Sequence, residues 1–125
     1  MTAVSATDVI KRFGRYPALN HVSVEAKSGE FLALLGPSGS GKTTLLRLLA
    51  GLDFPDSGTI TFDGEDVSAR PVRERGVGFV FQNYALFKHM TVAENIAFGL
   101  KVKPWRQRPR RRAIADRVEE LLDLV

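Results

Sequence analysis

The segment Leu34–Gly51, LLGPSGSGKTTLLRLLAG, decides the fold of this chain. It begins inside a continuous apolar run, FLALLG at 31–36, which predicts a strand buried on both faces of a parallel sheet. It ends in KTTLLRLLAG, 42–51, where leucines recur at helical spacing and Gly51 predicts the helix end. The order strand, glycine-rich loop, helix predicts the α/β fold class.

The residues between the two apolar segments match the phosphate-binding P-loop pattern without a mismatch. The glycines allow the backbone to curl so that N–H groups form an anion nest, and the helix N-terminus adds partial positive charge. Lys42 is placed to reach the β- and γ-phosphates, and Thr43 to offer its hydroxyl to Mg²⁺. The flanking strand and helix argue against an ordinary glycine-rich turn. The predicted residues of this site are Gly36, Pro37, Ser38, Gly39, Ser40, Gly41, Lys42, Thr43 and Thr44.

The composition narrows the class of protein. A length of 125 residues allows one modest domain with its own core, and no apolar run approaches the ~20 residues of a membrane helix. The absence of cysteine excludes disulfides and thiolate-bound zinc, and two distant histidines argue against a transition-metal site.

The positive charge is concentrated in one short stretch. The net charge is +4, and five arginines fall between positions 106 and 112. Such a run can bind nucleic acid or lipid headgroups, but Trp105 is the one aromatic nearby, whereas single-strand binders use several. We interpret the run as a solvated linker or helix start and expect no nucleic-acid partner.

The remaining patterns predict alternating strands and two more helices. Strands are expected at 4–13, 21–30 and 76–82, and a hairpin at 59–67 turns at Asp63-Gly64. Helices are expected at 91–102, where Thr91 and Glu94 form a capping-box pattern, and at 111–125. The apolar face of the last helix would consist of Ile114, Val118, Leu121, Leu122 and Val125.

In this order, these motifs resemble the N-terminal part of an ABC-transporter ATPase subunit. Phe13, in KRFG before the P-loop, matches the family's aromatic A-loop residue, which stacks on adenine; Tyr16 is a rival for that role. Gln82, in VGFVFQNYALF, matches the Q-loop glutamine, which contacts Mg²⁺ and the attacking water. MTVAENIAFGL resembles the helical segment that follows the Q-loop in importer subunits.

The resemblance implies a P-loop NTPase fold of the ABC ATPase kind, with a mixed sheet and an antiparallel β-subdomain. Residues 1–125 would be the N-terminal part of one nucleotide-binding domain, in which about 104–125 begin the helical subdomain. Residues 73–104 are most similar to sulfate/thiosulfate importer subunits, although maltose-type and polyamine-type subunits share much of the pattern. The implied partners are ATP, transmembrane permease subunits and a second ATPase subunit, at the cytoplasmic face of the inner membrane.

The family's signature motif, Walker B aspartate, catalytic glutamate and switch histidine have no counterpart in these residues, so no catalytic residue is assigned. We therefore expect a truncated chain, lacking the C-terminal half of the fold, that cannot hydrolyse ATP alone. We also expect exposed apolar surface on FLALL and on the helix 42–50, and hence poor solubility. A non-catalytic nucleotide-binding module, a small-molecule kinase and a nucleic-acid ATPase are the alternative hypotheses.

Overall fold

An antiparallel sheet organises the first part of the chain. The structure, a computed structural model, describes residues 1–125, which divide into two units, Met1–Phe79 and Val80–Val125. The four strands of the first unit lie in the order β2-β1-β3-β4. Their bounds are Val4–Phe13 for β1, Tyr16–Ala26 for β2, Ser57–Phe62 for β3 and Glu65–Asp66 for β4. The predicted turn at Asp63-Gly64 joins β3 to β4, and both residues have positive φ.

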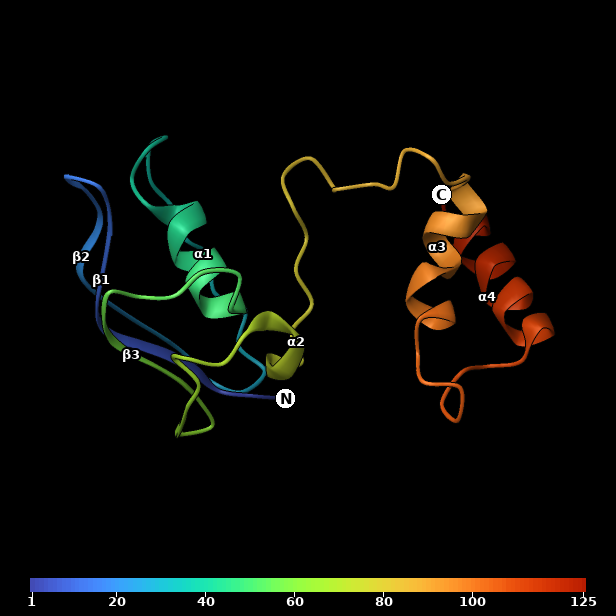
Figure 1. Ribbon diagram of the computed structural model, residues 1–125, viewed down its shortest axis with the longest axis horizontal. Coiled ribbons are helices and arrows are strands. Elements are labelled where there is room, and N and C mark those ends of the chain that lie inside the picture. The colour runs from blue at the N-terminus through green and yellow to red at the C-terminus, as the bar shows by residue number, and fades with distance from the viewer. The chain divides into compact units, whose positions relative to one another are not determined.

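Helix α1, Lys42–Ala50, covers one face of this sheet (Figure 1). Leu45 and Leu48 of the helix are buried, and they belong to a core with side chains from β1, β2, β3 and the segment after β4. The other members of that core are Ala6, Val9, Leu19, Ile60 and Val67. Gly51 ends the helix at φ 79°, as predicted, because only glycine adopts this left-handed conformation without strain. The apolar surface predicted to be exposed on 42–50 is confined largely to Leu46, which is 46% exposed, because Leu45 and Leu48 pack on the sheet.

The two predicted buried strands, 31–36 and 76–82, are not strands in the structure. Every ladder of the sheet is antiparallel, so of the predicted mixed sheet only the antiparallel part is present. The side chains of Phe31 and Leu35 are 94% and 92% exposed, which agrees with the expected apolar surface on this run. A central parallel strand is defined by hydrogen bonds to neighbours on both sides, and β1 to β4 do not provide such neighbours for either segment.

Two further differences concern local structure in the first unit. Strand β2 begins at Tyr16, earlier than the predicted start at 21, because its pairing with β1 extends to the hairpin end, where Tyr16 lies opposite Phe13. A short helix that the sequence did not predict, α2 at Val72–Arg75, follows β4. No helix of the structure is long and apolar enough to cross a membrane.

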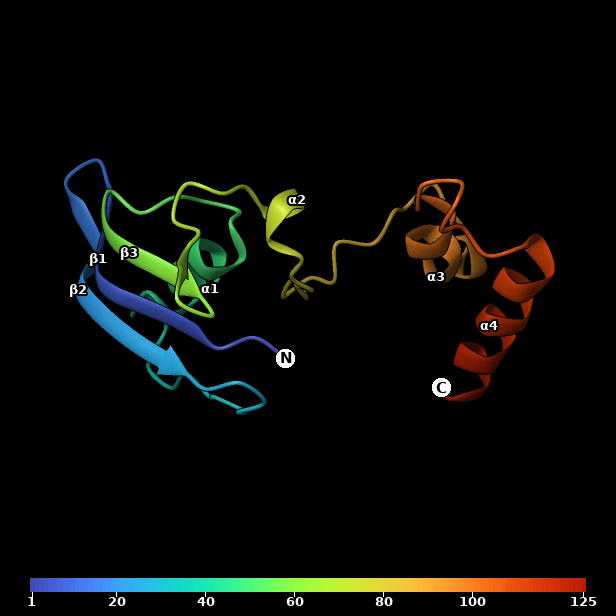
Figure 2. The ribbon, with the colours of Figure 1, turned by 90° about the horizontal axis from the view of Figure 1, so that it is seen from below.

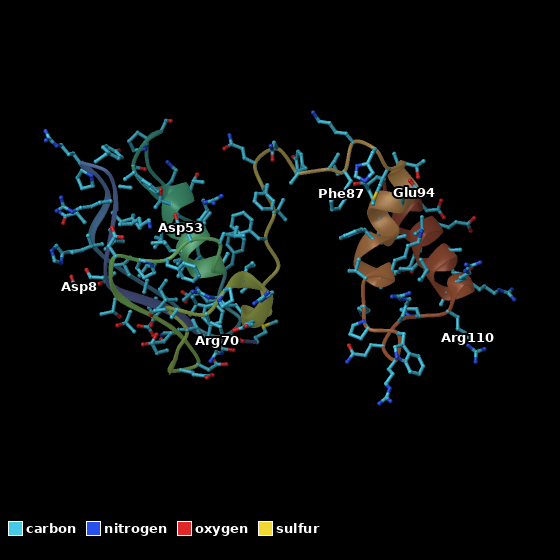
Figure 3. The ribbon with its side chains drawn as sticks, viewed as in Figure 1. Asp8, Asp53, Arg70, Phe87, Glu94 and Arg110 are labelled. Atoms are coloured by element: carbon cyan, nitrogen blue, oxygen red, sulfur yellow. The ribbon has the colours of Figure 1, made fainter.

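The second unit is a pair of helices (Figure 2), α3 at Val92–Lys101 and α4 at Arg111–Asp123. The predicted capping box is present: the Glu94 N–H donates to Thr91 Oγ1 at 3.1 Å, and the Thr91 N–H donates to Glu94 Oε2 at 2.7 Å. Figure 3 shows Glu94 at this end of α3 with Phe87 nearby, and the Phe87 N–H donates to Asn95 Oδ1 at 3.0 Å. The second unit contains α3 in addition to residues 104–125, the segment predicted to begin the helical subdomain.

Packing between α3 and α4 uses only part of the apolar face predicted for α4. Ile114 and Val118 are buried with Ala97 of α3. Leu122 is partly exposed and Val125 fully exposed, so the predicted face continues past the contact that α3 provides.

Candidate functional site

The glycine-rich loop before α1 depends on glycine at two positions. Gly39 and Gly41 have φ values of 81° and 92°, a region that other residues rarely adopt. A Cβ atom on Gly41 would lie 2.5 Å from the Ala18 carbonyl oxygen and 2.9 Å from the Leu19 side chain, both in β2. Gly41 therefore allows the loop to approach the sheet closely.

The Lys42 ammonium group folds back over this loop. Its Nζ donates to the carbonyl oxygens of Gly36 and Pro37, at 2.6 Å and 2.7 Å, and to Ser40 Oγ at 3.1 Å. All three acceptors are exposed loop atoms, so the amine can exchange them for other oxygens without breaking a buried contact. The arrangement holds a positive charge at the mouth of the loop.

The N-terminus of α1 adds to that charge. Gly41 is the N-cap residue, no side chain caps the helix, and the first turn contains no acidic residue. The first N–H groups of the helix and its partial positive charge are therefore not neutralised by this chain. Thr43 is exposed in the first turn, and Thr44 is partly buried beside it. This set of donors suits an anion such as a phosphate group.

One group beside this loop, the Thr43 hydroxyl, suits a Mg²⁺ ion that arrives with phosphate oxygens. The structure contains no cluster of three or more His, Cys, Asp or Glu side chains that could hold a metal ion by itself. The exposed hydroxyl of Thr43 is a hard oxygen ligand of the kind that Mg²⁺ accepts, and Mg²⁺ commonly takes most of its other ligands from phosphate and water.

Two aromatic residues lie at the hairpin end of β1 and β2. Phe13 and Tyr16 are paired across the strands, and both side chains are about half exposed. The Lys11 ammonium nitrogen lies 5.4 Å from the centre of the Phe13 ring. The Tyr16 hydroxyl donates to the Gly39 carbonyl oxygen at 3.0 Å. Tyr16, which the sequence offered only as a rival for base stacking, thus contacts the glycine-rich loop directly.

Gln82 lies in the second unit, in an exposed turn closed by a hydrogen bond of 2.9 Å from the Tyr84 N–H to the Phe81 carbonyl oxygen. Tyr84 and Ala85 both have positive φ, so the backbone after Gln82 is tightly bent. The predicted site residues of the first unit belong to one loop, one helix end and one hairpin, whereas the role of Gln82 stays a prediction.

The other end of α1 is held by a residue that the sequence did not identify. The Arg75 side chain is buried and donates to four carbonyl oxygens, those of Leu48, Leu49, Ser68 and Arg70. Two of these carbonyls are in the last turn of α1, where a cation is favourable for the helix dipole. Burial, and to a smaller extent the nearby Arg70, lowers the pKa of Arg75, but arginine stays charged at neutral pH. The pattern RERG gave no signal of this role, because the acceptors are distant in sequence.

A second ionic contact ties β1 to the loop after α1. Lys11 Nζ lies 3.2 Å from Asp53 Oδ1 and 3.8 Å from Asp56 Oδ1. Burial acts to raise the pKa of Asp53, but the Phe54 N–H and Lys11 outweigh it and lower the pKa below the ordinary value. The carboxylate is therefore charged at neutral pH and ties the loop after α1 to strand β1, which ends at Phe13.

Comparison with known proteins places these features in a family. Residues 19–125 match the ABC transporter family. The sulfate/thiosulfate import ATP-binding protein CysA of Caulobacter vibrioides is 63% identical over 122 residues, which are 98% of this chain and 36% of that protein. CysA of Ralstonia nicotianae is 60% identical over 123 residues, 98% of this chain and 33% of that protein. The chain spans about a third of the length of these curated relatives.

Solved structures agree with the fold. A dimeric, post-hydrolysis ATP-binding cassette, MJ0796 bound to ADP and phosphate, aligns at a TM-score of 0.80 with 31% identity, over 96% of this chain and 56% of that chain. A nucleotide-free ATP-binding cassette from an ABC transporter aligns at 0.73 with 27% identity, over 92% of this chain and 51% of that chain. The predicted fold class, an ABC ATPase P-loop fold, is thereby confirmed, and the chain belongs to the ABC transporter family.

Proposed function

We propose that this chain is the nucleotide-binding portion of an importer ATPase subunit, and that the imported solute is sulfate or thiosulfate. The observation that carries the nucleotide part is the Lys42 ammonium group, held over the uncapped N-terminus of α1 by three exposed loop oxygens. The names of the curated relatives support the solute.

Each predicted residue has a proposed role. Lys42 moves from the loop oxygens to the β- and γ-phosphates of ATP, and the backbone N–H groups of 38–44 bind phosphate oxygens. Thr43 is a ligand of Mg²⁺, which, when bound, neutralises charge between the β- and γ-phosphates. Phe13 stacks on the adenine ring, and Gln82 supplies a further contact to Mg²⁺.

The assembly is also part of the proposal. We assign both units to one nucleotide-binding domain, which pairs with a second copy and docks on transmembrane permease subunits at the cytoplasmic face of the inner membrane. Dimeric cassettes among the similar solved structures support the pairing. We assign no residue of this chain as the general base. The hydrolysis step is therefore assigned to groups other than Lys42, Thr43 and Gln82.

Binding of Mg-ATP to the chain tests the nucleotide part. Isothermal titration of the chain should show saturable binding, and Lys42→Ala should weaken it about 10- to 100-fold, since a hydrogen bond from a charged group contributes about 1.5–3 kcal/mol. Lys103→Ala is the matched control, because Lys103 is an exposed lysine of the second unit, and it should leave the affinity unchanged. Equal affinities for the two variants would refute the assignment of Lys42.

A chimera tests the solute and the permease. The corresponding N-terminal segment of a sulfate importer ATPase subunit is replaced by this chain, and sulfate-dependent growth is measured; a maltose importer chimera is the comparison. We expect the sulfate importer chimera to support growth on limiting sulfate. We expect the maltose importer chimera not to support growth on maltose. The reverse result would favour a maltose-type importer, and failure of both would favour a nucleotide-binding module that does not couple to a permease.

A further inference from the structure

The contact between Tyr16 and the glycine-rich loop fixes one peptide group of the proposed phosphate site. Tyr16 is the first residue of β2, so the sheet determines where its side chain begins. Its hydroxyl donates to the carbonyl oxygen of Gly39, 3.0 Å away. Gly39 has φ 81°, and a Cβ atom there would meet nothing within 4 Å, so Gly39 itself is not packed against a neighbour on that side.

The orientation of that peptide group decides which of its atoms faces the inside of the loop. The chain has no cis peptide bonds, and in a trans peptide the C=O and N–H point in opposite directions. When the Gly39 carbonyl points out to Tyr16, the Ser40 N–H of the same peptide points inward. In the structure this N–H donates to the Pro37 carbonyl oxygen over a long 3.3 Å, within the loop.

The opposite orientation would be unfavourable for an anion. A flipped Gly39-Ser40 peptide would present a carbonyl oxygen, which repels phosphate, in place of an N–H, which binds it. Rotation of this peptide changes ψ of Gly39 and φ of Ser40, and Gly39, which has no Cβ, restricts it little on its own side. A hydrogen bond from outside the loop is therefore a direct way to select the binding orientation.

We infer that Tyr16 is a positioning residue for the phosphate site: its hydroxyl holds the Gly39 carbonyl outward and so keeps the Ser40 N–H facing inward, where a phosphate oxygen can replace its long hydrogen bond to Pro37. This inference rests on the proposed function. It also separates the roles of the two aromatic residues at the hairpin end, because Tyr16 acts on the phosphate loop and Phe13 on the base.

Two ligands and two variants test the inference. Binding of Mg-ATP and of magnesium tripolyphosphate, which lacks the base and ribose, is measured for the wild-type chain and for Tyr16→Phe. Tyr84→Phe is the matched control, because it removes the hydroxyl of the only other tyrosine, which lies in the second unit. Tyr16→Phe should lower the affinity for both ligands by the same factor, about 2- to 10-fold for the loss of one neutral hydrogen bond. Tyr84→Phe should change neither affinity.

A second measurement follows the peptide itself. The ¹⁵N–¹H resonance of Ser40 should move in Tyr16→Phe before any ligand is added, while resonances of the β1–β3 ladder stay in place. Unchanged affinity for both ligands, or a loss for Mg-ATP alone, would overturn the inference while leaving the nucleotide site standing. No binding of either ligand by the wild-type chain would overturn the proposed function itself, and the inference with it.

Discussion

Replacing the Arg75 side chain with an apolar one of similar length should destabilise the first unit strongly. Arg75 is only 7% exposed, and its guanidinium donates to the Arg70 and Leu48 carbonyl oxygens at 2.6 Å and 2.7 Å. In Arg75→Met the buried Leu48 contact and the partly buried Arg70 contact both lose their donor. The C-terminus of α1 also loses the cation that complements the helix dipole.

The magnitude follows from the two short contacts. Hydrogen bonds from a charged donor contribute about 1.5–3 kcal/mol each, and the cost of burying the guanidinium, which disappears in the variant, offsets part of their sum. Neglecting the longer contacts to Leu49 and Ser68, the expected loss is about 3 kcal/mol in the free energy of unfolding. For a unit of this size that loss lowers the melting temperature by roughly 12–24 °C.

Urea unfolding followed by circular dichroism measures the change, and hydrogen exchange locates it. Peptides from α1 should lose protection in Arg75→Met, whereas peptides from α3, in the other unit, should keep theirs. Arg73→Met is the matched control, because the Arg73 side chain is 83% exposed and its ion pair with Glu74 is long at 3.8 Å, so a change within about 0.5 kcal/mol is expected. Equal unfolding free energies for the two variants would refute the capping role of Arg75.

Two other predictions concern the helix and loop termini. The Thr91 backbone N–H holds the pKa of Glu94 below its ordinary value of 4.5. The ionised Glu94 carboxylate therefore stabilises α3 fully above about pH 4.5, and this stabilisation is lost as the pH falls through the lowered pKa. Stability measured between pH 5 and 3 should show this loss in the wild type and a flatter profile in Glu94→Gln; parallel profiles would contradict the capping box. Gly41→Ala should lower the melting temperature more than Gly64→Ala does, and the difference should correspond to about 1 kcal/mol or more in unfolding free energy. Both glycines have positive φ, but of the two only Gly41 faces a close backbone neighbour. Equal shifts would show that the loop does not depend on this close approach.

Local features of the chain were determined by the sequence. The Gly51 stop of α1, the capping box of α3 and the Asp63-Gly64 turn all formed as predicted, because each depends on residues within a few positions of one another. The P-loop pattern also lies in consecutive residues, but the roles of its residues, like the role of Gln82, stay predictions.

Long-range contacts, by contrast, were decided only by the tertiary structure. The apolar runs 31–36 and 76–82 have strong strand patterns, but a strand needs hydrogen-bonding neighbours, and the antiparallel sheet does not provide them. The sequence did not mark Arg75 at all and offered Tyr16 only as a rival for base stacking, and folding placed one at the end of α1 and the other against Gly39. Side-chain patterns report which face of an element is apolar, whereas the partner that a donor finds many positions away depends on how the chain closes on itself.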